Sequence, residues 1–370
     1  MLHESPGRCR PADYRAVDLF AGPGGLDVAA EILGVPSVGI EWDAGACATR
    51  EAAGLRTERG DVRDFGPRDF PEANVLAGGP PCQTFTVAGR GAGRRALDEV
   101  LEYIRKIAKR EGLDGIKAEL DGLEDVRTGL VLQPLFWALE ALDEHDLRPY
   151  EVIVLEQVPA VLPVWEAYAE VLRGEGYAVA HGILRTEEYG VPQTRRRAVL
   201  VAHHGWEDIT LPEPTHQAYL KGVARTGPGG AREPWVTMAD ALQRTRTGSF
   251  RTVSNYGTGG DPKARGRRRS CEPSYTVTGK VSRTRVVTDD AAEAELPRLT
   301  EREMGSLQTF PERYPWSGND RSQQIGNAVP PRLGVHVLAR ALGREIPPGT
   351  WERLREWQPG RPAAPAGSSG

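Results

Sequence analysis

The chain has 370 residues, of which 39 % are hydrophobic and 26 % are charged, a composition typical of a soluble globular protein. No apolar run approaches the roughly 20 residues that a membrane-spanning helix needs, and the N-terminus lacks the apolar segment of a signal peptide, so we expect a cytoplasmic protein without membrane contact. The 47 basic and 51 acidic residues give a net charge of −4, which excludes a globally basic nucleic-acid-binding protein and leaves local charge to decide.

The first 205 residues alternate short apolar strands with helices. Strands are predicted at 15–20, 38–41, 74–79, 152–155 and 198–202. Residues 60–65, GDVRDF, are typical of a strand end that enters a loop. Helices are predicted at about 26–33, 130–143 and 163–174. This alternation predicts an α/β fold with a doubly wound, Rossmann-like mixed sheet whose strands are largely parallel.

The chain changes character after residue 205. Residues 206–297 are rich in Gly, Pro, Arg and Thr, with only short β-like runs such as SYTVTG, and predict a smaller, irregular domain. Helical patterning returns at 299–308 and 331–343, and we expect residues 298–345 to rejoin the first domain, 1–205. The composition of the last residues predicts that the tail, 346–370, is partly disordered.

A glycine-rich turn, DLFAGPGGLD, follows the first predicted strand. Gly22, Gly24 and Gly25 lie between this strand and the next helix, where backbone N–H groups and a helix N-terminus can meet a ligand. Such glycines are also typical of a simple tight turn. The motif therefore depends on support from the neighbouring strands.

Acidic residues follow the next two strands. Glu41 comes about 20 residues after the glycines, where a carboxylate can accept hydrogen bonds from ribose hydroxyls. Trp42 beside it would cover a purine face, and Asp61 would close the third strand and accept a bond from an adenine amino group. A plain strand end is the alternative for each residue alone. Together, in this order, they predict a site for an adenosine-containing cofactor.

Cys82 stands just past a predicted strand in GGPPCQTFT. Pro80 and Pro81 restrict φ and remove backbone donors, so the loop begins stiffly and in a defined direction. A lone cysteine is normally a small buried hydrophobe, but the polar, glycine-rich neighbours and the carboxyl end of a parallel strand favour a reactive thiol. The four cysteines lack the spacing of metal sites, so we expect free thiols and no bound metal.

In this order, the motifs resemble those of the DNA cytosine-5 methyltransferases over nearly the whole chain. DLFAGPGGLD, GIEWD and GDVRDF are similar to the cofactor motifs of the family, and GGPPCQTFT to its catalytic cysteine loop. Residues 127–142 are similar to the helix motif that follows. LEQVPAV at 155–161 is similar to the acidic motif, which commonly has Asn in place of Gln157, and QTRRRAVLVA at 193–202 to the Gln-x-Arg-x-Arg motif. Residues 298–316 and 323–334 resemble the last two motifs.

The resemblance implies a class I methyltransferase that uses S-adenosyl-L-methionine, releases S-adenosyl-L-homocysteine and needs no metal. The residues that it assigns to the cofactor are Phe20, Ala21, Gly22, Gly24, Gly25, Leu26, Glu41, Trp42, Asp61, Val62, Pro80, Leu130, Asn327 and Val329. The substrate that it implies is a cytosine extruded from duplex DNA, because a stacked base is out of reach of a catalytic thiol.

The resemblance also assigns four catalytic residues. Cys82 would add to C6 of cytosine, which makes C5 nucleophilic toward the methyl group. Glu156 would face N3 and the exocyclic amine as a proton donor or hydrogen-bond partner, a role that burial in VIVLEQV would favour. Of Arg195 and Arg197, one would hold the base oxygen and favour the thiolate, and the other would brace the site. Arg196 alternates to the other face and is interpreted as structural.

Two segments are expected to contact DNA. After the cysteine loop, residues 90–126 intervene where family members have a shorter segment, and a solvated helical hairpin is the favoured interpretation of its charged part. The alternative is that these added helices dock on DNA or on the protein surface. The basic stretch 263–285 lies in the expected target-recognition domain, 206–297. The expected DNA contacts are Gln83, Arg90, Arg94, Arg95, Arg267, Arg268, Arg269, Thr276, Thr278 and Lys280.

Two alternatives share part of this pattern. An RNA cytosine methyltransferase of the tRNA-methylating branch would share the catalytic core, but the Cys-Phe-Thr signature of that branch is absent from the sequence. A catalytically silent DNA-binding paralogue would be expected to have lost Cys82, Glu156 or the paired arginines, and all are present. The favoured interpretation is a monomeric DNA (cytosine-5)-methyltransferase acting on duplex DNA. A cognate restriction endonuclease would act separately.

Overall fold

The computed structural model describes residues 14–81, 92–122, 127–225, 230–257 and 265–359. Its centre is a seven-stranded sheet in the order β3-β2-β1-β4-β5-β8-β6. The strands are β1 (Ala16–Leu19), β2 (Ser37–Glu41), β3 (Thr57–Arg59), β4 (Val75–Gly78), β5 (Val152–Gln157), β6 (Tyr177–Arg185) and β8 (Arg196–His204). The strands from β3 to β5 run parallel, whereas β8 runs antiparallel between β5 and β6. The expected α/β fold with a doubly wound mixed sheet is confirmed.

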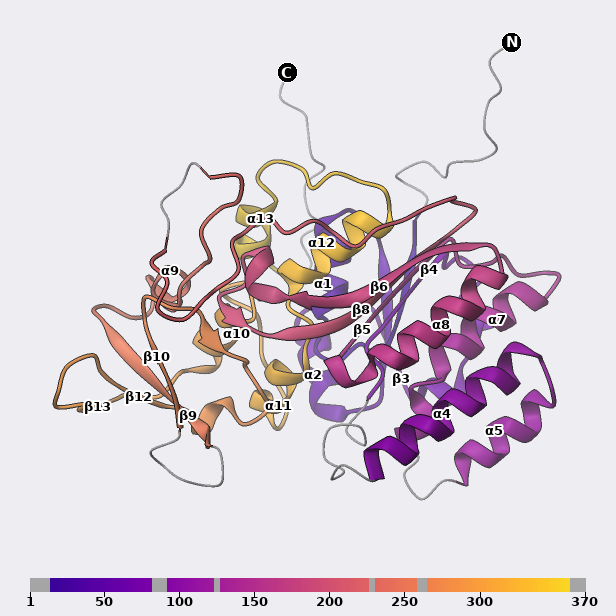
Figure 1. Cartoon of the computed structure of the whole chain (residues 1–370), viewed down its shortest axis with the longest axis horizontal. Coiled ribbons are helices and arrows are strands. Elements are labelled where there is room, and N and C mark those ends of the chain that lie inside the picture. The colour runs from indigo at the N-terminus through magenta and orange to yellow at the C-terminus, as the bar shows by residue number, and fades with distance from the viewer. Residues whose placement is uncertain (1–13, 82–91, 123–126, 226–229, 258–264, 360–370) are drawn as a thin grey trace, which may run out of the picture.

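Helices cover both faces of this sheet (Figure 1). One face packs against α4 (Ala92–Ala108), α5 (Leu113–Asp121), α7 (Gln133–Asp143) and α8 (Leu162–Gly174). The other packs against α1 (Gly25–Ile32), α12 (Pro331–Ala341) and α13 (Thr350–Glu356). α12 lies on α1, so the last part of the chain completes the layer that the first helix begins. Among the described helices, none is long and apolar enough to cross a membrane.

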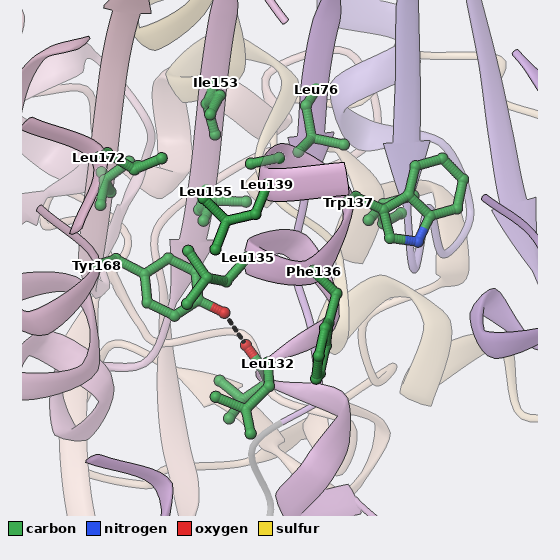
Figure 2. Close-up of a cluster of buried hydrophobic side chains, with 14 of the residues drawn as sticks. Leu76, Leu132, Leu135, Phe136, Trp137, Leu139, Ile153, Leu155, Tyr168 and Leu172 are labelled. Carbon is green, nitrogen blue, oxygen red and sulfur yellow. Dashed lines mark hydrogen bonds between the residues drawn. The ribbon is translucent and has the colours of Figure 1, made fainter. Parts of the chain in front are cut away.

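The core on the α7 and α8 face contains large aromatic side chains (Figure 2). Trp137 and Trp165 are buried in it, and the Tyr168 hydroxyl donates to the Val131 carbonyl over 2.7 Å. Leu155 of β5 packs in the same cluster. Because burying one such side chain contributes roughly 2 kcal/mol, this core holds β4 and β5 firmly where their carboxyl ends form the site described below.

The inserted segment after the cysteine loop is not a purely solvated hairpin. Ile104 and Ile107 of α4 and Ile116 and Leu120 of α5 are buried in the main core. Their spacing of three to four residues places them on one face of each helix, while the charged residues occupy the other. The expectation of a solvated hairpin was therefore wrong for the apolar face, which the sequence shows at helical spacing.

A second, four-stranded sheet lies beside the main one (Figure 1). Its order is β10-β9-β12-β13, formed by β9 (Phe250–Gly257), β10 (Arg265–Arg269), β12 (Arg285–Thr288) and β13 (Glu295–Leu296). A small core packs it against α9 (Met238–Leu242), α10 (Glu301–Leu307) and α11 (Arg321–Asn327). β11 (Ser274–Tyr275) pairs with β7 (Gln193–Thr194), which joins this region to the strand entering β8.

Other described elements also differ from the expectations. The α2 helix (Ala44–Ala52) and the β6 strand were not predicted, and α13 forms inside the segment expected to be a partly disordered tail. Asp43 caps α2 by accepting a hydrogen bond from the Ala46 N–H over 2.8 Å. Trp357 is buried just after α13. Leu354, Trp351 and Trp357 pack this segment onto the core formed by α1 and α12.

Candidate active site

A cleft of about 790 Å³ opens at the carboxyl edge of the main sheet. Its walls come from the glycine-rich turn after β1, the ends of β2 and β5, the start of β8 and residues 319–329. The predicted site residues that line it are Phe20, Ala21, Gly22, Gly25, Leu26, Glu41, Trp42, Asp61, Val62, Leu130, Glu156, Arg195, Arg197, Asn327 and Val329. The structure does not place Gly24 and Pro80 among the lining residues.

The glycines after β1 have two different tasks. Gly24 caps α1 with φ at 100°, and a Cβ there would lie 2.2 Å from a methyl group of Leu55. A Cβ on Gly25 would lie 2.1 Å from the carbonyl oxygen of Val329. The absence of a Cβ at Gly24 and Gly25 therefore allows close packing, in the case of Gly25 against the C-terminal segment. Gly22 lines the cleft, and its backbone N–H donates a hydrogen bond to Glu41.

Glu41 fixes the shape of the turn. Its carboxylate accepts hydrogen bonds from the backbone N–H groups of Gly22 (2.7 Å), Trp42 (2.9 Å) and Asp43 (2.7 Å). Burial raises the pKa of Glu41, and these hydrogen bonds act in the opposite direction. A carboxylate has about four acceptor positions, so one remains for a ligand hydroxyl. The side chain of Trp42, 67 % exposed, stands beside it as a free aromatic face.

Asp61 lies beyond the third strand, not at its end. β3 ends at Arg59, and Asp61 caps the short turn that follows by accepting from the Arg63 backbone N–H. The Arg63 side chain also binds both carboxylate oxygens, over 3.0 and 2.7 Å, and lowers the pKa of Asp61. Arg63 reaches Asp121 of α5 as well, over 2.8 Å, so the inserted hairpin supports this edge of the cleft.

Asp18 was missed by the sequence analysis. It lies on β1, lines the cleft and is buried, and its Oδ1 has no hydrogen-bond partner among the described residues. Burial, followed by the neighbouring Asp27 carboxylate, raises the pKa of Asp18 well above its ordinary value. Buried carboxyl oxygens are normally paired, so this one is an acceptor that a ligand can use.

Glu156 and Arg197 form an ion pair inside the cleft. Glu156 is next to last in β5, and its Oε1 lies 2.8 Å from Nε of Arg197, the second residue of β8. Both side chains are largely buried, at 7 % and 12 % exposure. Arg197 Nη1 also donates to the Arg196 carbonyl over 2.7 Å. The pair presents a carboxyl group and guanidinium donors side by side, which suits a planar ring that carries both donors and acceptors.

Arg195 braces the structure with a side chain that is almost fully buried in the wall of the cleft. Its Nη1 donates to the carbonyls of Val277 (3.0 Å) and Gly326 (2.9 Å), and its Nη2 to that of Ala328 (3.2 Å). Burial lowers the pKa of Arg195, with the neighbouring Arg197 acting in the same direction. Arg195 therefore joins the start of β8 to the segment after β11 and to the end of α11.

Gln157 connects the acidic strand to the proline loop. Its Nε2 donates to the Pro80 carbonyl over 2.6 Å, and its Oε1 accepts from the Val158 N–H over 2.5 Å. The longer side chain that replaces the common Asn thus reaches the backbone just before Cys82. Pro80 is buried and meets the site through this contact, with Pro81 forming the wall of the cleft.

Several predicted residues lie outside the described part. Cys82, Gln83 and Arg90 belong to residues 82–91, and Arg94 is described only as backbone within α4. Arg95 is exposed on the same helix.

The arginines of β10 are largely occupied by acidic partners. Arg269 binds Asp289 over 2.8 Å, and Arg267 pairs with Glu293. Arg268 is buried between the rings of Tyr219 and Tyr275, with its guanidinium carbon 4.2 and 4.6 Å from their centroids. These acidic partners follow β10 by some twenty residues in the sequence, and the turn after β12 places them beside β10. The local charge count in the sequence therefore overstated how many arginines are free to bind DNA.

The other residues expected at DNA sit on the segment after β11. The Thr276 hydroxyl donates to the Thr194 carbonyl over 2.9 Å, which reinforces the pairing of β11 with β7. The Thr278 hydroxyl accepts from the Lys280 N–H over 3.3 Å, and the Lys280 side chain is exposed. A Cβ on Gly326 would lie 2.1 Å from the Thr278 carbonyl carbon, so this segment touches the wall of the cleft.

Known proteins are similar to this chain over most of its length. A family model described as C-5 cytosine-specific DNA methylase matches residues 14–111 and 133–343. Type II methyltransferase M1.HphI of Haemophilus parahaemolyticus is 27 % identical over 362 residues, covering 88 % of this chain and 86 % of that protein. Type II methyltransferase M.NgoBI of Neisseria gonorrhoeae is 26 % identical over 317 residues, covering 81 % and 84 %. The family model passes over residues 112–132, which include α5.

Solved structures agree at the level of the fold. The crystal structure of the S. pombe Dnmt2 methyltransferase has a TM-score of 0.58 at 15 % identity, covering 89 % of this chain and 98 % of that one. A putative DNA modification methyltransferase encoded within an E. coli prophage has a TM-score of 0.56 at 16 % identity, with the same coverages.

Proposed function

The chain belongs to the C-5 cytosine-specific DNA methylase family, and from this premise we propose that it methylates C5 of a cytosine extruded from a specific duplex DNA sequence, through a covalent bond between Cys82 and C6. The enzyme is a DNA cytosine-5-methyltransferase. The observation that carries the proposal is the Glu156–Arg197 pair, held in the same cleft as the glycine-rich turn.

The cleft fits S-adenosyl-L-methionine, the methyl donor of this class. Glu41 has one acceptor position left for a ribose hydroxyl, and Trp42 offers an exposed face for the adenine ring. The unpartnered Asp18 oxygen suits the cationic amino group of the methionine part. When bound, the cofactor supplies a methyl group on a positively charged sulfur. Val62 and Leu130 would exclude water from the adenine edge.

Glu156 and Arg197 would hold the target base. Addition of the Cys82 sulfur to C6 pushes electron density toward N3 and O2, so donors must already point at those atoms. Arg197 would donate to O2, and Glu156 would bond to N3 and the exocyclic amine. Because the guanidinium binds Glu156 before any base arrives, both groups are fixed in the absence of substrate, and little reorganisation is needed. Arg195 would act only as the brace.

We expect Glu156→Gln to lower the methylation rate on the order of a hundredfold or more while changing cofactor affinity little. The amide keeps the shape of the side chain but cannot supply the proton, and positioned acid–base groups contribute roughly 10²–10⁴-fold. Single-turnover transfer of labelled methyl groups to duplex DNA measures the first quantity, and titration of S-adenosyl-L-homocysteine measures the second.

Glu166→Gln is the matched control for this change, because Glu166 is exposed on α8, away from the cleft. It should leave both quantities unchanged. If Glu156→Gln weakened cofactor binding as much as it slowed methylation, Glu156 would belong to the cofactor site instead.

DNA recognition is assigned to residues 206–297 as a target-recognition domain, with residues 1–205 and 298–345 forming the catalytic part. Support comes from the second sheet, which β11 and Arg195 attach to the rim of the cleft. We propose a monomer whose cognate endonuclease, where one exists, acts separately. Transfer of labelled methyl groups to duplex DNA, to RNA and to no nucleic acid tests the substrate class. Methylation-aware sequencing of DNA from cells that express the protein then identifies the recognised sequence.

A further inference from the structure

Two arginines face each other at the catalytic edge of the main sheet. Arg185 is the last residue of β6 and Arg196 the first of β8, and the antiparallel register places them directly opposite one another. Cβ atoms of such a pair are about 5 Å apart, and like charges at this distance repel. We call Arg185 and Arg196 the rim pair.

The position of the rim pair is fixed by the sheet. Gln157 ends β5 and pairs with Ala198, so Arg196 extends beyond β5 at the edge where the cleft opens. Side chains alternate along a strand, so Arg196 points to the face opposite Arg197, the face that α8 covers. Ala198 lies on that same face and packs in its core. The rim pair therefore stands next to the proposed base site, across the sheet from Arg197.

The charge of the rim pair is largely uncompensated within the described part of the chain. Arg196 is exposed, Arg185 is half-buried, and neither forms an ion pair with a described side chain. Both guanidinium groups act on the buried Glu187 carboxyl, but burial is the larger effect and raises the pKa of Glu187 to about 7. A single carboxyl group, even when ionised, cannot cancel two positive charges.

The arginines of the second sheet differ in this respect. Arg251 and Arg269 share Asp289, over 2.7 and 2.8 Å, and Arg251 also binds Glu293. The Asp289 side chain is only 4 % exposed, so this network is part of the local structure. A repelling, unneutralised pair has no such structural use, which points to an anionic ligand brought by the substrate.

We propose that the rim pair binds the DNA phosphate backbone next to the extruded cytosine, on the α8 side of the cleft. The proposal rests on the proposed function, since an extruded base at Glu156 and Arg197 brings its flanking phosphates over this edge. Guanidinium groups bind phosphate oxygens through two parallel hydrogen bonds, and two of them side by side suit adjacent phosphates. The repulsion within the pair is relieved when the duplex binds.

The salt dependence of duplex binding tests this inference. The logarithm of the association constant falls with the logarithm of salt concentration by about 0.9 for each neutralised phosphate. We expect Arg185→Gln/Arg196→Gln to reduce that slope by roughly 1 to 2 and to weaken binding, while S-adenosyl-L-homocysteine affinity stays at the wild-type value. Arg185→Lys/Arg196→Lys keeps the charge and should restore most of the slope.

Lys109→Gln provides the matched control, because it removes an exposed positive charge next to α4 at the opposite edge of the sheet. It should leave the slope unchanged. If the rim-pair variant keeps the wild-type slope while wild-type protein binds and methylates duplex DNA, the inference is overturned and the proposed function stands. If wild-type protein neither binds nor methylates duplex DNA, both are overturned.

Discussion

Replacing Cys82 by alanine is expected to abolish methyl transfer, with a fall on the order of a thousandfold or more, while duplex DNA still binds. C5 of cytosine is a weak nucleophile, and only addition of sulfur to C6 gives it enamine character. Alanine cannot add, so the barrier returns to that of the unactivated ring. The side chain is small, and its loss removes no charge that would hold DNA. Labelled methyl transfer and a gel-shift titration with the same duplex measure the two expected results.

Cys271→Ala is the control for Cys82→Ala, since the Cys271 thiol is exposed and lies in the turn after β10, apart from the residues that line the cleft. It should leave methylation unchanged. A duplex containing 5-fluorocytosine provides an independent measurement, because fluorine at C5 prevents the final elimination and the adduct accumulates. A covalent complex with wild-type protein and none with Cys82→Ala is expected. Substantial methylation by the alanine variant would remove Cys82 from the mechanism.

The second large effect is expected for Arg195→Met, which should lower the free energy of unfolding by about 2–5 kcal/mol. The buried carbonyls of Val277 and Gly326 would lose their guanidinium donor, and the Ala328 carbonyl would keep only the longer hydrogen bond from Gln308 Nε2, at 3.4 Å. Removing a buried charge also removes its desolvation cost. Methionine, however, has no hydrogen-bond donor for these carbonyl oxygens, and each unsatisfied acceptor costs roughly 1–3 kcal/mol. Urea denaturation followed by circular dichroism measures the difference.

Arg197→Met separates bracing from catalysis. Arg197 lines the cleft, and its Nε lies 2.8 Å from Oε1 of the largely buried Glu156, so its loss should reduce methylation strongly. Because the pair lies at an open cleft, the shorter methionine side chain would admit water to the Glu156 carboxylate, and the loss of stability should be smaller than for Arg195→Met. The two arginines stand two residues apart in one motif. We therefore expect Arg195→Met to affect mainly the free energy of unfolding, and Arg197→Met to affect mainly the methylation rate. An Arg195→Met protein as stable as the wild type would contradict the bracing role of Arg195.

Periodic patterns predicted most of the main sheet and its helices. β1, β4 and β5 are short apolar runs, and α8 has apolar residues at helical spacing, so local sequence was sufficient there. α2 was missed because AGACATREA contains no large apolar residue, and the helix depends on its Asp43 cap and on packing with residues from the C-terminal segment. The inserted hairpin was judged by its charges, although its isoleucines form an apolar face.

The site depended on contacts that local sequence does not show. The glycine-rich turn and Glu41 were found because they follow strands at regular spacing. Asp18 was missed because DLF looks like any buried strand, and its unpartnered oxygen is visible only in three dimensions. The arginines of β10 were expected to be free because their acidic partners come from β12 and beyond. The rim pair is formed by strand register, which the sequence alone did not specify.

The close contact between Gly25 and Val329 has a consequence for how the protein folds during synthesis. The Tyr314 hydroxyl also donates to the Pro23 carbonyl there, so residues some three hundred positions apart form the wall of one cleft. A ribosome must translate past residue 329 before a complete cofactor cleft can exist, and a nascent chain halted earlier exposes the bare flank of α1. Cofactor that binds only the finished cleft would favour this late docking by mass action, so starvation for the methyl donor would leave a larger share of new chains open to proteolysis.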